Sequence, residues 1–466
     1  MKNYDTYTGI ISYKKIDFTF IFDKKILKLI PPKEKQREVG MWFMKEIEKG
    51  VYTFGDPIYV EEIIYGIANE TGQRIVLIPA HKSIGRINST LLIDIEFYII
   101  NKYNREKIDR IAIKGPEITH IFPTTSALNK INWGDNGVID VITKPFSETT
   151  TEKEKFSIDE KELLLYFGIS ISSSYKTGES PISLSSTMFI EFDATDDYEF
   201  IITLLRVSKQ FIQYLCYRRN VVFSSVEIAS PTANGLHETF ATLYETQEND
   251  VIETYPIEKE RFIKYGYIKG IIGKIIDDIV TKTIYLEHIP ETYELGRHIN
   301  AGRFVMITAA FEWEFKRNYP LGIAKSKKTI EAEKRVTDII DDLIKNNTGK
   351  SKEIFKFLKK LIKSDNLESR IIEYGNDYGN ISDIFGNHLY NLNNEKLDYK
   401  QMGKRLSDQR NHFAHGDIDK EFIGLSLLDL IYLEYIVYIM QLKFYGLDDD
   451  MIKCAINDLF RCNLAL

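Results

Sequence analysis

The spacing of apolar residues changes near Pro290, and this change limits the folds that the chain can adopt. Before Pro290, residues such as 91–97 alternate apolar and polar side chains with the period of two that is typical of a half-buried strand. After it, apolar residues recur every three or four positions, as in residues 304–315, which favours helices buried on one side. The sequence therefore predicts an α+β fold, with a β-rich domain of residues 1–294 and a helical domain of residues 295–466.

Further elements follow from the same two patterns. Seven other short segments rich in Ile, Val, Phe and Tyr predict strands at residues 10–13, 18–22, 74–78, 110–113, 138–142, 162–171 and 187–192. We expect a helix after Thr195 or Asp196 and a second β stretch at 221–229, and the polar run 147–155 predicts a flexible connection that divides this part into two subdomains. Helical spacing returns at residues 330–344, 354–362, 399–413 and 422–445, so we expect a bundle of about five helices.

Composition limits the classes of function. The 466 residues are 44% hydrophobic, enough for two or three domains with real cores. The net charge of −7 argues against a protein that coats nucleic acid through its overall charge. Residues 295–466 hold 26 basic and 25 acidic side chains, so the excess of acid belongs to residues 1–294. Any contact with nucleic acid must therefore be local.

Basic side chains concentrate in one part of the helical domain. This basic belt consists of Lys325, Lys327, Lys328, Lys334, Arg335, Lys345, Lys350, Lys352, Lys356, Lys359, Lys360 and Lys363. It is either the solvated face of two helices or a surface that contacts phosphates, because a local stripe of Lys and Arg is what phosphate binding requires.

The remaining compositional signals predict a protein of the reducing cytoplasm. Three scattered cysteines exclude a disulfide framework and a zinc site made of cysteines. The N-terminus lacks the apolar core of a signal peptide, so we do not expect export. The most apolar stretch, residues 422–440, contains Asp429 and Glu434, and it therefore predicts a buried helix and no membrane span.

The most informative segment is residues 410–416, Arg-Asn-His-Phe-Ala-His-Gly, in a chain with eight histidines. Arg410 could bind a phosphate with its two-pronged guanidinium. His415 titrates near neutral pH and could exchange a proton with a ribose hydroxyl. Asn411 could hold either partner in place.

Helix geometry restricts how these side chains can meet. Five residues at ~100° each put Arg410 and His415 about 140° apart on a straight helix. They converge only if the helix ends or distorts at Gly416, if the long arginine wraps round, or if two copies meet across a dimer axis. Two alternatives stay open: His412 and His415 share a face and could bind a metal, or the segment has a structural role, with Arg410 capping carbonyl groups.

The segment resembles the signature of the HEPN superfamily, an arginine followed after four to six residues by a histidine, with Asn or Asp beside the arginine. Arg405 and His412 satisfy the same spacing, so the alignment on Arg410 depends on Asn411 and Gly416. The chain as a whole is similar to the ApeA-like family of bacterial abortive-infection proteins. Residues 187–216 resemble the strand and helix of its N-terminal domain, and residues 303–317, with Glu312, resemble the first HEPN helix.

The resemblance implies a metal-independent endoribonuclease without a cofactor, whose composite site forms in a homodimer or higher homo-oligomer and leaves a cyclic phosphate and a free 5′-hydroxyl. Its catalytic residues would be Arg410, Asn411 and His415, supported by His412 and Glu312. The residues expected to contact RNA are Lys325, Lys327, Lys328, Lys359 and Lys360. The partners would be cellular RNA, such as transfer RNA, and a phage-derived trigger at the N-terminal domain. Two alternatives are a non-catalytic dimerisation or binding module and a metal-dependent hydrolase.

Overall fold

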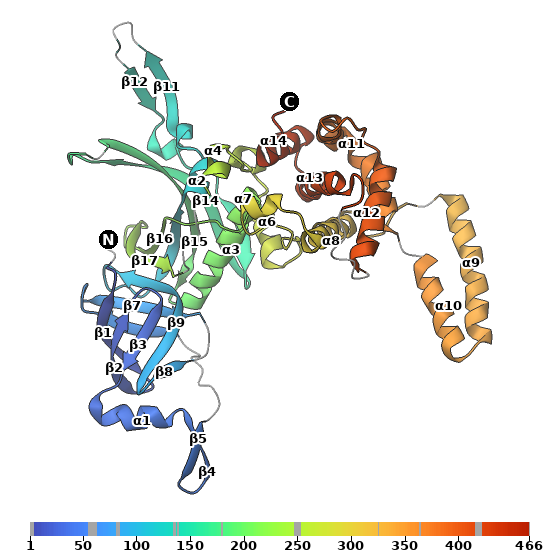
Figure 1. Cartoon of the computed structure of the whole chain (residues 1–466). Coiled ribbons are helices and arrows are strands. Elements are labelled where there is room, and N and C mark those ends of the chain that lie inside the picture. Colours follow the sequence, from blue (N-terminus) through green and yellow to red (C-terminus); the bar gives the residue numbers. More distant parts are fainter. Residues whose placement is uncertain are drawn as a thin grey trace. The chain divides into compact units, whose positions relative to one another are not determined.

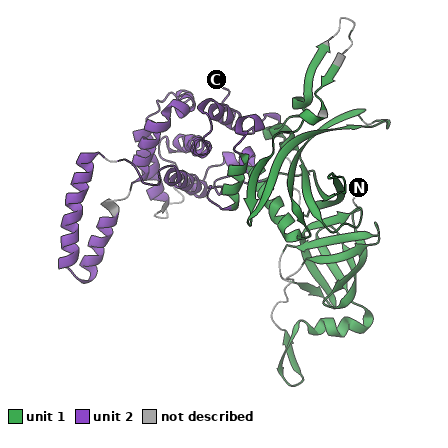
Figure 2. Cartoon of the chain, turned by 180° about the vertical axis from the view of Figure 1, so that it is seen from behind, with its two compact units in different colours: residues 1–213, 220–257, 272–280 green, residues 214–219, 258–271, 281–466 purple. Residues whose placement is uncertain are grey.

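The computed structural model of the chain describes residues 4–54, 63–80, 84–133, 137, 139–178, 180–246, 253–324, 326–362, 365–414 and 422–465 (Figure 1). It has the predicted α+β fold. The chain forms two compact units (Figure 2): unit 1 comprises residues 1–213, 220–257 and 272–280, and unit 2 comprises residues 214–219, 258–271 and 281–466. The units are interleaved in sequence, so a single boundary after residue 294 does not describe them.

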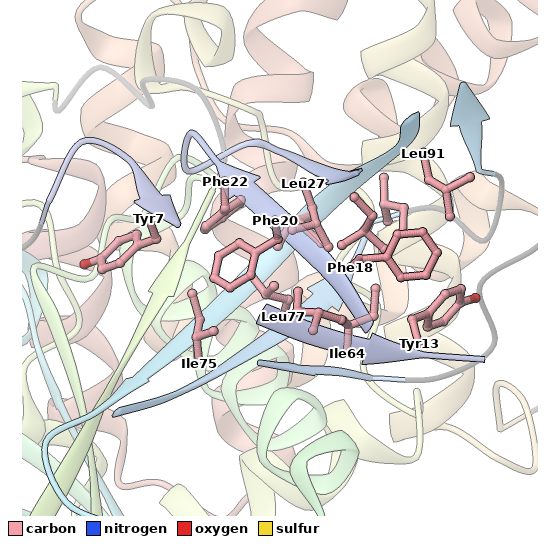
Figure 3. Close-up of a cluster of buried hydrophobic side chains, with 14 of the residues drawn as sticks. Tyr7, Tyr13, Phe18, Phe20, Phe22, Leu27, Ile64, Ile75, Leu77 and Leu91 are labelled. Atoms are coloured by element: carbon pink, nitrogen blue, oxygen red, sulfur yellow. The ribbon is translucent and has the colours of Figure 1, made fainter. Parts of the chain in front are cut away.

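Six strands of unit 1 close into a ring. They are β1 (Tyr7–Tyr13), β2 (Ile16–Phe22), β3 (Ile26–Ile30), β6 (Ile64–Ala68), β7 (Gln73–Pro79) and β9 (Thr90–Asn101). Their order is β9-β3-β2-β1-β6-β7, all antiparallel, and β7 pairs again with β9 to complete the ring. Alternate residues of β2, Phe18, Phe20 and Phe22, point into the ring (Figure 3) and are fully buried. This alternation explains why the sequence pattern identified these strands.

The same sheet continues from β9 through a second set of strands. These are β10 (Ile108–Lys114), β13 (Glu154–Ile158), β14 (Lys161–Ser173), β15 (Ile182–Thr195), β16 (Ser225–Pro231) and β17 (His237–Glu245), in the order β13-β14-β15-β10-β16-β17-β9. The polar run 147–155 is not a flexible link within this part. Thr149 Oγ1 donates to the Ile169 carbonyl at 3.1 Å, and the Thr151 amide donates to the Phe167 carbonyl at 2.8 Å. The Thr149 side chain and the Thr151 backbone thus attach the run to β14.

Further helices and strands complete the first part of the chain. They are α1 (Gln36–Met41), β4 (Met44–Glu48), β5 (Val51–Phe54), β8 (Gly85–Ile87), α2 (Pro116–Ile121), β11 (Leu128–Trp133), β12 (Ile139–Thr143), α3 (Tyr198–Cys216), α4 (Thr254–Glu258), α5 (Tyr265–Ile268), α6 (Ile272–Val280) and α7 (Tyr293–Arg297), with 3₁₀ turns at Lys33–Lys35, Thr124–Ala127 and Phe146–Glu148. The expected helix after residue 195 is α3. The expected β stretch at 221–229 begins later, at Ser225, as β16.

Unit 2 contains a helical bundle and a two-helix hairpin. The bundle comprises α8 (Ala301–Asn318), α11 (Leu367–Asn391), α12 (Tyr399–Ala414), α13 (Ser426–Phe444) and α14 (Asp449–Phe460), with α13 packed against the other four. The hairpin comprises α9 (Lys327–Asn346) and α10 (Gly349–Ile362), which pack on each other. The five predicted helices correspond to α8, α9, α10, α12 and α13, whereas α11 and α14 are additional. No helix in the described ranges has the length and apolarity needed to cross a bilayer.

Candidate active site

The predicted catalytic segment begins in the last turn of α12. Arg410, Asn411 and His412 lie in this turn, where Asn411 is exposed and His412 is half-buried. His415 and Gly416 follow α12 in the sequence but lie outside the described residues, as does Lys325. The structure therefore places the arginine and the amide at the C-terminal end of the described part of α12.

Glu312 of α8 joins Arg410 to a second arginine. Its Oε1 atom accepts from Arg410 Nη1 at 2.8 Å and from Arg370 Nη1 at 3.2 Å. Arg370 lies in the first turns of α11, so three helices contribute one side chain each. On α8, Phe311 directly precedes Glu312 and Phe315 lies three residues after it. Both rings are buried, which fixes the helix while Glu312 stays partly exposed. The contact brings together two of the residues predicted for the site, Arg410 and Glu312.

The charges of this cluster leave a net positive group at the surface. Two guanidinium ions share one carboxylate, so the three side chains together carry one positive charge. The Arg410 side chain is 40% exposed, against 24% for both Glu312 and Arg370. A guanidinium has five N–H donors, and the contact with Glu312 engages only Nη1 of Arg410. Glu312 can therefore orient Arg410 while donors remain accessible to an anionic ligand.

The chain on both sides of residues 415–421 is attached to the bundle. Phe413 packs edge-on against Phe304 of α8 at 5.3 Å and against Phe422 at 5.6 Å between ring centroids. The Ile423 amide donates to Oε1 of the buried Gln409 at 2.8 Å. The points at which the chain leaves α12 and returns to α13 are thus held together by aromatic packing and a buried amide.

Arg405, the alternative arginine of the signature, occupies a different environment. Its Nε and Nη2 atoms each donate to a different carboxylate oxygen of Asp429 at 2.7 Å. Asp429 is fully buried on α13 and also accepts from the Tyr390 hydroxyl. Two of the three nitrogens of this guanidinium are therefore bound within the protein. This geometry favours Arg410 as the arginine of the predicted site.

The lysines predicted to contact RNA lie on the hairpin. Lys327 and Lys328 are exposed at the beginning of α9, and Lys360 is exposed on α10. Lys359 instead pairs with Asp341 of α9, with Nζ 2.7 Å from Oδ2. Lys359 therefore joins the two helices, and its role in the hairpin is at least partly structural.

Sequence reasoning missed several charged residues of the bundle. Glu314 is buried on α8 and pairs with Arg317 at 3.1 Å, and Arg303 pairs with the buried Glu434 of α13. The signal for Asp429 and Glu434 was present, because carboxylates in a buried apolar helix require partners. No local signal marks Arg370, whose partner lies 58 positions away in sequence.

Unit 2 also contains a cavity away from Arg410. This cavity of about 260 Å³ is lined by Tyr293, Tyr435, Phe460, Arg261 and Glu434, among others. Its charged groups have partners within the protein: Glu434 binds Arg303, and Arg261 Nη1 donates to the Phe460 carbonyl at 3.3 Å. Over the residues that the structure describes, no three His, Cys, Asp or Glu side chains gather as metal ligands would. Comparisons with family models, curated proteins and solved structures find no match to the chain.

Proposed function

We propose that the protein is a metal-independent endoribonuclease of anti-phage defence, which cleaves cellular RNA through Arg410, Asn411 and His415 of unit 2. The observation that carries this proposal is the contact of Arg410 with Glu312 at 2.8 Å, in a cluster that Arg370 completes. A carboxylate that orients an exposed arginine five residues before a histidine in sequence supports phosphate chemistry, because the two residue types can supply charge stabilisation and proton transfer.

The proposed reaction is an attack of a ribose 2′-hydroxyl on the adjacent phosphorus. One imidazole of His415 takes the hydroxyl proton as the 2′-oxygen forms a bond to phosphorus. The bond from phosphorus to the 5′-oxygen then breaks, and this oxygen takes a proton from an imidazolium. Arg410 stabilises the charge on the phosphorane, and Asn411 positions the nucleotide. The products are a 2′,3′-cyclic phosphate and a 5′-hydroxyl.

Two copies of the segment supply the acid and the base in this proposal. When attack of the 2′-oxygen and departure of the 5′-oxygen overlap, base and acid act at the same time, and the His415 residues of two copies can take these opposite roles. A homodimer in the cytoplasm, acting on RNA such as transfer RNA, is therefore the proposed active form. The acidic unit 1 would restrain the site until it binds a phage-derived trigger. His412 and the exposed lysines Lys327, Lys328 and Lys360 would support RNA binding through local positive charge.

The test uses total RNA incubated in EDTA with purified full-length protein. Wild type should cleave it, and His415→Ala and Arg410→Ala should each lower the rate by about 10²–10³-fold. His298→Ala and Arg105→Ala are matched controls, because both side chains are exposed and lie outside the cluster. Product ends that accept a 5′-phosphate from a kinase without prior phosphatase treatment would show the 5′-hydroxyl.

Cleavage that is equal in wild type and His415→Ala, or that EDTA abolishes, would overturn the proposal. Metal bound in stoichiometric amount by wild type and lost in His412→Ala would favour a metal-dependent hydrolase. If wild type is inert on RNA and is as toxic on expression as Arg410→Ala, a non-catalytic binding module explains unit 2 better.

A further inference from the structure

The hairpin of α9 and α10 exposes apolar side chains at coiled-coil spacing. On α9, Ala332, Val336, Ile339 and Leu343 are separated by four, three and four residues, which is the a/d spacing of a heptad repeat. We refer to these four residues as the α9 seam. Val336, Ile339 and Leu343 are 44%, 60% and 37% exposed, so α10 does not cover the seam. Coiled-coil spacing on an exposed helix face is typical of a surface that packs against another helix.

The second helix of the hairpin extends this apolar face. Ile354, Phe357 and Leu358 of α10 are 58%, 60% and 40% exposed and are spaced three and four residues apart. The helices face each other through Ile340, which is buried on α9, and through the pair of Lys359 with Asp341.

Helix geometry puts the two apolar stripes on one face of the hairpin. Each stripe can be located by its angle around its own helix axis, measured from the side that faces the other helix. This angle is roughly 100° for α9 and 140° for α10, in the same sense of rotation. Because the helices are antiparallel, the same sense of rotation places both stripes on one side. Rotation in the opposite sense places Lys334, Lys345, Lys356 and Lys360 on the other side. The hairpin thus has one apolar face and one face rich in lysine.

The charges beside the α9 seam are complementary to a second copy of the same helix. With Val336 and Leu343 at heptad position a and Ile339 at d, both Arg335 and Asp342 occupy position g. When two such helices pack antiparallel, the g positions of both lie along the same edge of the interface. A two-fold axis at Ile339 then sets Val336 of one copy opposite Leu343 of the other, and Arg335 of one opposite Asp342 of the other. Each such dimer therefore contains two pairs of opposite charges, one on each side of the two-fold axis.

We propose that the hairpin is a self-association surface, on which the hairpin of a second copy packs antiparallel to form a four-helix bundle with Ile339 at the two-fold axis. Within the monomer, Arg335 lies 3.9 Å from Glu331 and Asp342 lies 3.8 Å from Lys345, and all four side chains are largely exposed. Such pairs are worth little and can exchange partners. A nucleic-acid occupant is disfavoured, because Val, Ile and Leu offer no donor to phosphate. This association goes beyond the proposed pairing of catalytic segments and needs no RNA.

Charge exchange in the full-length protein tests this arrangement, with mass measured by light scattering and by sedimentation over a range of concentrations. Arg335→Asp alone sets like charges opposite each other, and so does Asp342→Arg alone. Each should weaken self-association at least about tenfold. A mixture of the two single variants pairs an acidic helix with a basic one, so it should restore association as a heterodimer. The double variant Arg335→Asp/Asp342→Arg should associate as wild type does.

Ile339→Lys should remove the association because it buries a charge at the axis, while Lys334→Asp on the lysine-rich face should leave it unchanged. Circular dichroism would show that each variant folds. Equal masses for wild type and Ile339→Lys at every concentration would overturn the proposal, as would a mixture of single variants that fails to associate. So would wild type that stays monomeric and sediments with phospholipid vesicles, since that result would assign the face to lipid. None of these readouts depends on RNA cleavage, so the hairpin and the ribonuclease can fail separately.

Discussion

The bundle of unit 2 and the hairpin of α9 and α10 differ in how much of their side-chain surface is buried. In the bundle, charged groups are inside and paired, as Arg405 is with Asp429 and Arg303 is with Glu434. In the hairpin, charged groups are exposed and apolar ones are too, and Ile340 is the sole buried residue among its described side chains. The bundle therefore gains stability from burial within one chain, whereas the hairpin gains little from burial.

The same contrast occurs within α12, five residues apart. Arg405 is bound by a buried carboxylate that no solvent reaches, whereas Arg410 is bound by a carboxylate at the surface. The first arrangement holds α12 against α13. The second leaves a guanidinium accessible to a ligand. An arginine in a helix can thus be structural or available for chemistry, depending on where its partner lies.

Removing Arg405 should have the largest effect on stability. Arg405→Ala leaves Asp429 buried without its cation, which should lower the free energy of unfolding of unit 2 by ~3–5 kcal/mol. Urea denaturation followed by far-ultraviolet circular dichroism, which the helices dominate, would measure it. Arg410→Ala is the matched control and should change stability by less than about 1 kcal/mol, because its ion pair is partly exposed. Equal losses in both variants would contradict the distinction between the two arginines.

Truncating isoleucines tests the apolar side of the comparison. Ile436 of α13 is fully buried, and Ile436→Ala should cost ~2–5 kcal/mol through lost contacts and a cavity. Ile330 of α9 lies outside the seam and is 52% exposed, so Ile330→Ala should change stability by no more than about 0.5 kcal/mol. The same denaturation experiment compares them. A large loss for Ile330→Ala would show that the hairpin stabilises the chain more than its exposure indicates.

The fold class was predictable because the apolar period changes from two to 3.6, but α11 was not. This helix contains Gly375, Gly379 and Gly386, which weaken a helix by about 1 kcal/mol each and obscure its pattern. A Cβ on Gly375 would lie 2.5 Å from the Tyr399 ring, and one on Gly386 would lie 2.7 Å from the Tyr432 ring. The glycines allow α12 and α13 to approach closely. The role of these glycines depends on tertiary packing, so no local sequence pattern could reveal it.

The site was predictable only in part for a similar reason. Residues near each other in sequence, Arg410 and Asn411, stand out by type and spacing. The contact between Arg410 and Glu312 spans 98 positions, and only the packing of α8 against α12 shows that Glu312 faces the arginine. Arg370 was missed because the helix that carries it was missed. Local chemistry can be predicted from spacing, whereas the partners that orient it come from the packing of helices.

His288 extends the comparison to an imidazole, because it is an ionisable group that is buried in unit 2 among aromatic rings. Its ring contacts Tyr217, Tyr285 and Tyr438. Burial, reinforced by the charges of Arg303 and Arg219, lowers the pKa of His288 to about 3. In the unfolded chain the imidazole of His288 takes up a proton as the pH falls through about 6.5, whereas in the folded chain it stays neutral. The stabilising contribution is therefore complete above pH ~6.5 and is lost as the pH falls toward about 3.

This loss should amount to about 1.4 kcal/mol per pH unit, or about 2 kcal/mol between pH ~6.5 and ~5. His288→Phe cannot take up the proton in either state, so its stability should fall less steeply over that range. His298, whose side chain is 74% exposed, provides the control, and His298→Ala should keep the wild-type slope. Urea midpoints measured across the range give the slopes. If wild type and His288→Phe lose stability in parallel, the imidazole is not held neutral by burial, and other groups cause the acid sensitivity of unit 2.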